Sequence, residues 1–320
     1  MRIVILDGYT LNPGDLSWDE LKALGDLSVY DSTPHDTLLE RAQGAQVLIT
    51  NKTPLRADTL AALPDARCIC VLATGYDVVD VAAARARNIP VCNTPAYGVD
   101  SVAQHVFALL LELCRGVARH DASIRDGEWG RRREFCYWLS PQVELTGKTM
   151  GIVGFGNNGR RVGELAHAFG MAVLAHEPKP GVVAPSYAPF AFVALDELFA
   201  TSDVISLHCP LTDATRAMVN ADRLAAMREG ALIINTGRGP LLDEAAVAAA
   251  LHSGRLGGLG TDVLAVEPPL ADNPLLQSPN TYITPHIAWA SLRARRNIID
   301  ITVANLRGFV EGKPQNVVNP

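Results

Sequence analysis

The 320-residue chain has no excess of positive charge. It carries 28 lysine and arginine residues against 34 aspartate and glutamate residues, which gives a formal net charge of -6. A protein that binds nucleic acid needs a basic face to neutralise phosphates. The densest basic cluster, "RRRE" at 131–134, is interpreted as a solvated loop. The composition therefore predicts that nucleic acid is not a partner.

Long hydrophobic runs and an N-terminal targeting segment are also missing. The longest apolar stretches, such as the one from Val106 to Cys114, are shorter than the roughly 20 residues that a membrane span requires. The N-terminus enters a short strand pattern at once and turns at Asp7 and Gly8, without the apolar region and cleavage site of a signal peptide. The sequence therefore predicts a cytoplasmic protein with no membrane partner.

No cysteine or histidine pattern indicates a disulfide framework or a metal site. The eight histidines show neither H-x-x-x-H nor H-E-x-x-H spacing, so no metal is expected. The six cysteines form no C-x-x-C pair and are interpreted as small buried hydrophobic residues that stay reduced. They are Cys68, Cys70, Cys92, Cys114, Cys136 and Cys209.

The sequence does contain a regular alternation of short apolar strand patterns with helical segments. Such an alternation predicts parallel sheets built from β-α-β units. The strand patterns begin at or next to Arg2, Gln46, Cys68, Thr149, Met171, Asp203, Ala231 and Thr281.

Two series of strand patterns are separated by a long helical segment that two lobes would share. One series ends before about Tyr97 and the other begins after about Lys148. The segment between them begins at Asp100 or Ser101, either of which can cap a helix, and continues with apolar residues in helical spacing. A C-terminal helix over 288–309, followed by a strand-like tail, would return to the first lobe. We therefore predict an α/β fold of two lobes, the first discontinuous in sequence (1–98 and 290–320) and the second continuous (99–289).

The second lobe begins with a glycine-rich turn, "GFGNNG". Gly154, Gly156 and Gly159 have G-x-G-x-x-G spacing, after a strand pattern and before a helical one. The first glycine allows a tight turn, the second lets a pyrophosphate approach the backbone, and the third lets helix and strand pack closely. The spacing and its context predict a dinucleotide-binding lobe of the Rossmann type.

Glu177 follows the glycine-rich turn, at the end of the next strand pattern. A carboxylate there binds both ribose hydroxyls and repels a 2′-phosphate, so NAD(H) is predicted in preference to NADP(H). His176 and Lys179 leave room for the use of both cofactors. The alternative interpretation is that Glu177 is an ordinary exposed charge at a strand end.

Arg238, Glu267 and His286 form a second constellation. Each follows a strand pattern and lies close to glycine or proline, so the three side chains can converge on one edge of the second lobe. An arginine can hold a carboxylate and polarise a carbonyl group, and a histidine can give or take the hydroxyl proton of a 2-hydroxyacid. Each residue alone is compatible with a structural role, and only their combination with the dinucleotide turn favours catalysis.

Long motifs run through nearly the whole chain, among them "LATGYD", "LTGKTMGIVGFGNNGR", "LHCPLT", "INTGRGPLLDE", "DVLAVEPP" and "NTYITPHIAWAS". In this order they resemble the D-isomer-specific 2-hydroxyacid dehydrogenase family, and within it the NAD-dependent glycerate dehydrogenases, also called hydroxypyruvate reductases. The resemblance implies two Rossmann- or flavodoxin-like lobes, the first for substrate and the second for NAD(H). It also implies hydride transfer between NAD(H) and a small D-2-hydroxyacid or 2-oxoacid, with hydroxypyruvate and D-glycerate as the first expectation.

The same resemblance assigns roles to single residues. Arg238 is expected to bind the substrate, His286 to act as the acid/base, and Glu267 to pair with that histidine. Backbone groups of Thr74 and Gly75 are expected to cradle the substrate carboxylate. The chain is also expected to form a homodimer, largely through the cofactor lobe and its helix near 101–118. The expected cofactor-binding residues are Gly154, Gly156, Asn157, Asn158, Gly159, Glu177, Cys209, Pro210, Thr236, Gly237, Arg238, Asp262 and His286.

Two departures from the family pattern and several alternatives accompany this interpretation. Asn158 stands where relatives usually have an apolar residue, and Gln104 stands where many have glutamate. Relatives with the same three catalytic residues use glyoxylate, pyruvate, phosphoglycerate or phosphite. An NADH-sensing binding protein, similar to the corepressors that resemble this family, is the alternative outside enzymes and would require an exposed apolar groove on the first lobe.

Overall fold

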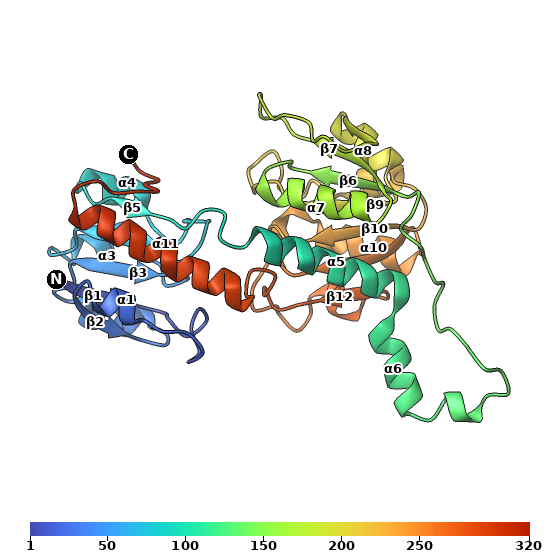
Figure 1. The fold of residues 1–320 in the computed structure, drawn as a ribbon, viewed down its shortest axis with the longest axis horizontal. Helices are drawn as coiled ribbons and strands as arrows, with labels where there is room; N and C mark the ends of the chain where they lie inside the picture. The colour runs from blue at the N-terminus through green and yellow to red at the C-terminus, as the bar shows by residue number, and fades with distance from the viewer. The chain divides into compact units, whose positions relative to one another are not determined.

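The computed structural model describes all 320 residues, which divide into two compact units (Figure 1). Unit 1 comprises Met1–Gly98 and Ala290–Pro320, and unit 2 comprises Val99–Trp289. Each unit has its own sheet, and every strand pair within both sheets is parallel. The predicted α/β class with parallel sheets is therefore confirmed.

The sheet of unit 1 has the strand order β2-β1-β3-β4-β5. Strand β2 lies on one side of β1, and the strands from β3 onward lie on the other side, so the strand order reverses between β1 and β3. The residues of β3 and β4 are buried at every position, as expected for parallel strands that are covered on both faces. This is the flavodoxin-like order, which binds ligands where the strand order reverses. The strands are β1 (Arg2–Ile5), β2 (Asp26–Val29), β3 (Val47–Thr50), β4 (Cys68–Val71) and β5 (Val91–Cys92).

The C-terminal helix α11 (Leu292–Val310) packs against the sheet of unit 1, near β4 (Figure 1). It begins later than predicted because Ser291 caps it, with Oγ accepting the Ala294 N–H at 3.2 Å. The expected strand-like tail forms only a single antiparallel bridge, between Val317 and Cys92. The other helices of unit 1 are α1 (Asp19–Lys22), η1 (His35–Thr37), α2 (Leu38–Ala42), α3 (Ala57–Ala61) and α4 (Val81–Ala86).

A buried carboxylate fixes the loop at the point where the strand order of unit 1 reverses. Asp7 follows β1, and its side chain accepts the backbone N–H groups of Asn51, Lys52 and Thr53 at 2.7, 2.5 and 2.7 Å. Because a carboxylate that accepts several N–H groups holds the backbone tightly, the loop after β3 is preorganised.

The sheet of unit 2 has the strand order β12-β11-β10-β9-β6-β7-β8. The order in which successive strands are added reverses between β6 and β9, and this is the position where Rossmann sheets bind dinucleotides. The strands are β6 (Thr149–Val153), β7 (Ala172–His176), β8 (Phe190–Phe192), β9 (Val204–Leu207), β10 (Ala231–Asn235), β11 (Leu256–Thr261) and β12 (Thr281–Ile283).

The long helix α5 (Val99–Arg115) belongs to unit 2, where it packs against α7, β10 and β11. It ends earlier than predicted because Gly116 adopts a left-handed conformation (φ +54°), and α6 (Val117–Arg125) continues at an angle of 55° (Figure 1). No single helix is long and apolar enough to cross a membrane, and these two pass that test only as a bent pair. The remaining helices are η2 (Trp129–Arg131), α7 (Asn157–Ala168), α8 (Leu195–Thr201), α9 (Ala221–Ala226), η3 (Gly239–Leu241), α10 (Glu244–His252) and η4 (Pro274–Gln277).

Strands β2, β5, β8 and β11 are absent from the strand patterns named above, and β11 shows why. Its sequence, LGGLGT, is rich in glycine because α5 lies directly on it. A Cβ atom at Gly260 would lie 2.8 Å from Cβ of Leu109, and one at Gly258 would lie 2.6 Å from Cδ2 of Leu113. Close packing of the helix therefore requires glycine at positions where a strand usually has the β-branched residues that identify it.

The cysteine prediction is correct for four of the six residues. Cys136 is exposed, because the segment around it after η2 has no regular structure that could bury it, and Cys209 is half-buried. Neighbouring strands also bring Cys70 opposite Cys92, a proximity that sequence spacing did not indicate.

His208 follows β9 and is a half-buried histidine. Its N–H donates to the Val153 carbonyl oxygen at 2.8 Å, and its Nε2 atom lies 2.8 Å from Oγ of Ser206. Burial lowers the pKa of His208 to about 4. As the pH falls, the unfolded chain therefore takes up a proton on this histidine near pH 6.5, whereas the folded chain takes it up only near pH 4.

This pKa predicts that acid destabilises the protein through His208. Between pH 7 and pH 5 the free energy of unfolding should fall by about 2 kcal/mol on account of this group. Replacing His208 with Gln removes the ionisation, so His208→Gln should lose about 2 kcal/mol less than the parent over that interval. Urea unfolding at both pH values measures the difference, with the exposed His252→Gln as a control. Equal losses in the parent and His208→Gln would contradict the prediction.

Candidate active site

Three adjacent strands of unit 2 end at the segments that carry Arg238, Glu267 and His286. Strands β10, β11 and β12 are neighbours and parallel, with Asn235 paired to Thr261. Because parallel strands present their carboxyl ends at one edge of a sheet, the segments that follow them start from the same edge.

The turn after β10 is built to present the Arg238 side chain. The buried Asn235 accepts the Gly237 N–H through Oδ1 at 3.0 Å and donates through Nδ2 to the Arg238 carbonyl oxygen at 2.9 Å. Gly239 passes so close to the next loop that a Cβ atom would lie 1.9 Å from the carbonyl carbon of Leu264. The Arg238 side chain itself is exposed and bonds only the neighbouring Gly237 oxygen, at 2.9 Å. Its guanidinium group is therefore available to an anionic ligand.

Glu267 and His286 form a hydrogen-bonded pair. Nδ1 of His286 lies 2.6 Å from Oε2 of Glu267, and Oε1 of Glu267 accepts the Leu264 N–H at 3.1 Å. Because an ionised carboxylate can only accept, Nδ1 carries the hydrogen and Nε2 faces other partners. The His286 side chain is 30% exposed and its backbone has φ +56°, an uncommon conformation for a residue with a side chain. The pair thus presents one ring nitrogen of a fixed histidine.

The glycine-rich turn after β6 has the geometry of a phosphate cradle. Gly154 has φ +92°, and a Cβ atom there would lie 2.6 Å from the Cys209 nitrogen. A Cβ atom at Gly159 would lie 2.1 Å from the Gly154 oxygen, whereas one at Gly156 would meet nothing within 4 Å. Gly156 is also the N-cap residue of α7 and offers no side-chain cap, so the first N–H groups of this helix remain available to an anion.

Glu177 lies beside the same turn, at the carboxyl end of β7. Its Oε2 atom accepts the Phe155 N–H at 2.8 Å, and its Oε1 atom accepts the Lys179 N–H at 3.0 Å. At the end of β10, Oγ1 of Thr236 is buried and has no hydrogen-bond partner. A buried hydroxyl without a partner is costly unless a ligand satisfies it. The cradle and this hydroxyl both fit a dinucleotide at this edge.

The other predicted cofactor contacts have mixed exposure. Asn157 is exposed and Asn158 half-buried in the first turn of α7, while Cys209 and Pro210 follow β9. Asp262 is only 1% exposed, and both of its carboxylate oxygens accept hydrogen bonds from the loop that carries His286. The contacts of Asp262 thus support this loop.

The predicted substrate cradle, Thr74 and Gly75, belongs to unit 1 and follows β4. The segment after β5 pins this loop: Thr74 Oγ1 donates to the Thr94 oxygen at 3.0 Å, and Asn93 Nδ2 donates to the Thr74 oxygen at 2.8 Å. The backbone N–H groups of Thr74 and Gly75 donate to no other group of the protein. They are therefore available to a carboxylate.

Sequence reasoning missed His105 and Thr284, which contact Asp262. His105 lies on α5 and its Nε2 atom is 2.8 Å from Oγ1 of Thr284. The available signal was the histidine directly before the apolar run "VFALLL", because a polar side chain in a buried segment needs a hydrogen-bond partner.

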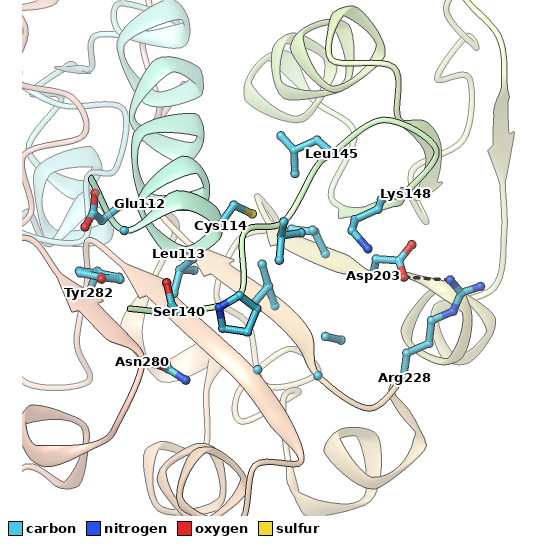
Figure 2. Close-up of a pocket in the computed structure, with 18 of the residues that line it drawn as sticks. Glu112, Leu113, Cys114, Ser140, Leu145, Lys148, Asp203, Arg228, Asn280 and Tyr282 are labelled. Carbon is cyan, nitrogen blue, oxygen red and sulfur yellow. Dashed lines mark hydrogen bonds and ion pairs between the residues drawn. The ribbon is translucent and has the colours of Figure 1, made fainter. Parts of the chain in front are cut away.

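A cavity of about 340 Å³ lies at the opposite edge of the sheet of unit 2 (Figure 2). It is lined by residues that precede strands, including Lys148 before β6 and Asp203 before β9, and Asp203 pairs with Arg228 at 3.0 Å. None of the predicted site residues lines it. The candidate active site is therefore the carboxyl edge of the sheet rather than this cavity.

Comparisons with known proteins agree with this arrangement. Residues 107–288 match the family described as D-isomer specific 2-hydroxyacid dehydrogenase, NAD binding domain. The chain is 45% identical to a hydroxypyruvate reductase of Blautia hydrogenotrophica over 322 residues, covering 100% of both chains. It is 42% identical to a glycerate dehydrogenase of Methylorubrum extorquens, covering 99% of this chain and 98% of that protein. The solved structure of the TT0316 protein from Thermus thermophilus is similar with a TM-score of 0.88 and 36% identity, covering 99% of this chain and 100% of that one.

Proposed function

The chain belongs to the D-isomer-specific 2-hydroxyacid dehydrogenase family, and on this basis we propose that it reduces hydroxypyruvate to D-glycerate. As a member of this family it is an oxidoreductase that uses NAD(H) and acts on a small 2-hydroxyacid or 2-oxoacid. The choice of hydroxypyruvate is supported by the names of two relatives that align over essentially the whole chain, one a hydroxypyruvate reductase and the other a glycerate dehydrogenase.

The observation that carries the proposal is the 2.6 Å contact between His286 and Glu267 at the edge where Arg238 is exposed. In the proposed reduction Arg238 binds the oxoacid and polarises its ketone oxygen. Protonated His286 gives a proton from Nε2 to that oxygen as hydride reaches the carbon. Glu267 holds the imidazole through Nδ1, so Nε2 stays directed at the substrate.

The cofactor is proposed to bind across the carboxyl ends of β6, β7 and β10. Its pyrophosphate would lie on the turn from Gly154 to Gly159 and on the start of α7, and Thr236 Oγ1 would gain a partner near the nicotinamide ribose. When bound there, the nicotinamide supplies the hydride. Gly237, Asp262, Cys209 and Pro210 are proposed to complete this site, with Asn157 and Asn158 next to the phosphates.

Preference for NAD(H) over NADP(H) is proposed to depend on Glu177. Its carboxylate is held beside the turn by the Phe155 and Lys179 N–H groups, in the place where ribose hydroxyls bind in Rossmann lobes. A 2′-phosphate there would meet a fixed negative charge at close range, which is unfavourable.

Unit 1 is proposed to be the substrate domain, and unit 2 the NAD-binding domain. The free N–H groups of Thr74 and Gly75 suit the substrate carboxylate. We also propose a homodimer formed through unit 2, because α6 has no buried residue and its Val117 and Ile124 side chains are 66% and 42% exposed. The cytoplasmic location stays a prediction.

The substrate proposal predicts a preference among oxoacids. NADH oxidation at 340 nm should be fastest with hydroxypyruvate when it is compared at equal concentrations with glyoxylate, pyruvate and 3-phosphohydroxypyruvate. A clear preference for another oxoacid would identify that oxoacid, instead of hydroxypyruvate, as the substrate. NADH binding without reduction of any oxoacid would reject the proposed reaction and favour phosphite oxidation or an NADH-sensing role.

The acid/base proposal predicts the effect of removing the imidazole. His286→Ala should lower kcat by about 10² or more, the usual contribution of a general acid, and leave the Kd for NADH within about twofold. Steady-state kinetics and fluorescence titration of NADH measure these two quantities. A variant with turnover close to the parent would show that another group supplies the proton.

The cofactor proposal predicts a change in selectivity. Glu177→Ala should reduce the ratio of kcat/KM for NADH over NADPH by about tenfold or more, because it removes the charge that opposes the 2′-phosphate. Glu164→Ala, on the exposed face of α7, is the matched control and should leave the ratio unchanged. An unaltered ratio in Glu177→Ala would mean that selectivity arises elsewhere.

A further inference from the structure

A chain of hydrogen bonds connects helix α5 to the loop that carries His286. Nε2 of His105 lies 2.8 Å from Oγ1 of Thr284, and this hydroxyl lies 2.6 Å from Oδ1 of Asp262. An ionised carboxylate can only accept, so the Thr284 hydroxyl donates to Asp262. The hydroxyl must then accept from His105, which fixes the hydrogen of that imidazole on Nε2. All of these groups belong to unit 2.

Asp262 binds the loop on both sides of His286. Its Oδ1 atom also accepts the Ile287 N–H at 2.8 Å, and its Oδ2 atom accepts the Ala288 N–H at 2.8 Å. Its backbone oxygen accepts the His286 N–H at 2.9 Å. One buried residue thus ties down the positions before, at and after the histidine.

This support is needed because the His286 backbone is in the left-handed region, with φ +56°. For a residue with a side chain this conformation persists only when its surroundings determine it. Trp289 Nε1 donates to the His286 oxygen at 2.8 Å, and Ser101 Oγ donates to the Ala288 oxygen at 2.6 Å. Helix α5 therefore holds the loop at two points, through Ser101 and through His105.

We propose that His105 is a positioning residue that sets the orientation of His286 through Thr284 and Asp262. Its side chain is only 18% exposed, and it contacts neither of the proposed reacting groups directly. Its role in turnover rests on the function proposed above. A catalytic group that moves by about 1 Å can lose 10²-fold in rate, so a partner that restrains the loop affects kcat more than substrate affinity.

Residues other than His105 also hold α5 against the sheet. The helix is seated by Leu109 and Leu113, which lie against Gly260 and Gly258 of β11 without room for a Cβ atom at either glycine. Loss of the His105 hydrogen bond should therefore leave α5 in place and release only the loop. Release of the loop with α5 still in place would distinguish a positioning role of His105 from a general structural role.

Kinetics of four variants test the connection. His105→Leu and Thr284→Val each remove one link, and each should lower kcat by about tenfold with KM for the oxoacid within about twofold of the parent. His105→Gln retains a donor and should recover most of the loss. The double variant His105→Leu/Thr284→Val should be no slower than either single variant, because both substitutions break the same chain. Additive losses, or equal effects of Leu and Gln, would overturn the proposal.

Hydrogen exchange supplies a readout that does not depend on activity. In His105→Leu the amides of Ile287 and Ala288 should exchange at least tenfold faster than in the parent, while amides of β6 and β10 should be unchanged. His252→Leu, an exposed substitution on α10, should alter neither exchange nor kcat. Unchanged exchange at the loop, or faster exchange throughout unit 2, would overturn the proposal. If the parent reduces no oxoacid, the proposed function fails, whereas exchange still decides whether His105 holds the loop.

Discussion

The parallel pairing of β10, β11 and β12 is the constraint on which the site of unit 2 depends. It makes three distant segments of the chain leave the sheet at one edge, where Glu267 and His286 meet at 2.6 Å. The reversal of strand order between β6 and β9 places the glycine-rich turn at the same edge. One sheet therefore positions both the residues proposed for catalysis and the turn proposed for cofactor binding.

Buried polar side chains convert this edge into a site of fixed geometry. Asn235 shapes the turn that exposes Arg238, and Asp262 gathers the loop around His286. In unit 1 the buried Asp7 does the same for the loop after β3. In each case a side chain at a strand end replaces the hydrogen bonds that an irregular loop cannot make for itself, so the loops stay ordered without regular structure.

Features that depend on local sequence could be predicted, and features that depend on proximity in space could not. The glycine spacing around Gly156 and the strand periodicity indicated the fold class and the dinucleotide edge. The glycine-rich strand β11 was not predicted because its glycines are required by close packing against α5, a helix more than 140 residues earlier in the chain. The role of His105 was not predicted for the same reason, since its partners Thr284 and Asp262 lie far away in sequence. The family resemblance named Glu267 and His286 and implied that they pair, whereas the 2.6 Å geometry of that contact came from the structure.

The most direct test of the account is a crystal structure of the protein with NAD and D-glycerate bound. We expect the C2 hydroxyl to lie within about 2.6–3.2 Å of Nε2 of His286, the reach of a general acid/base. We also expect the carboxylate of glycerate to contact Arg238. Glycerate bound away from His286, or an Nε2 atom turned from the hydroxyl while Glu267 still holds Nδ1, would contradict it.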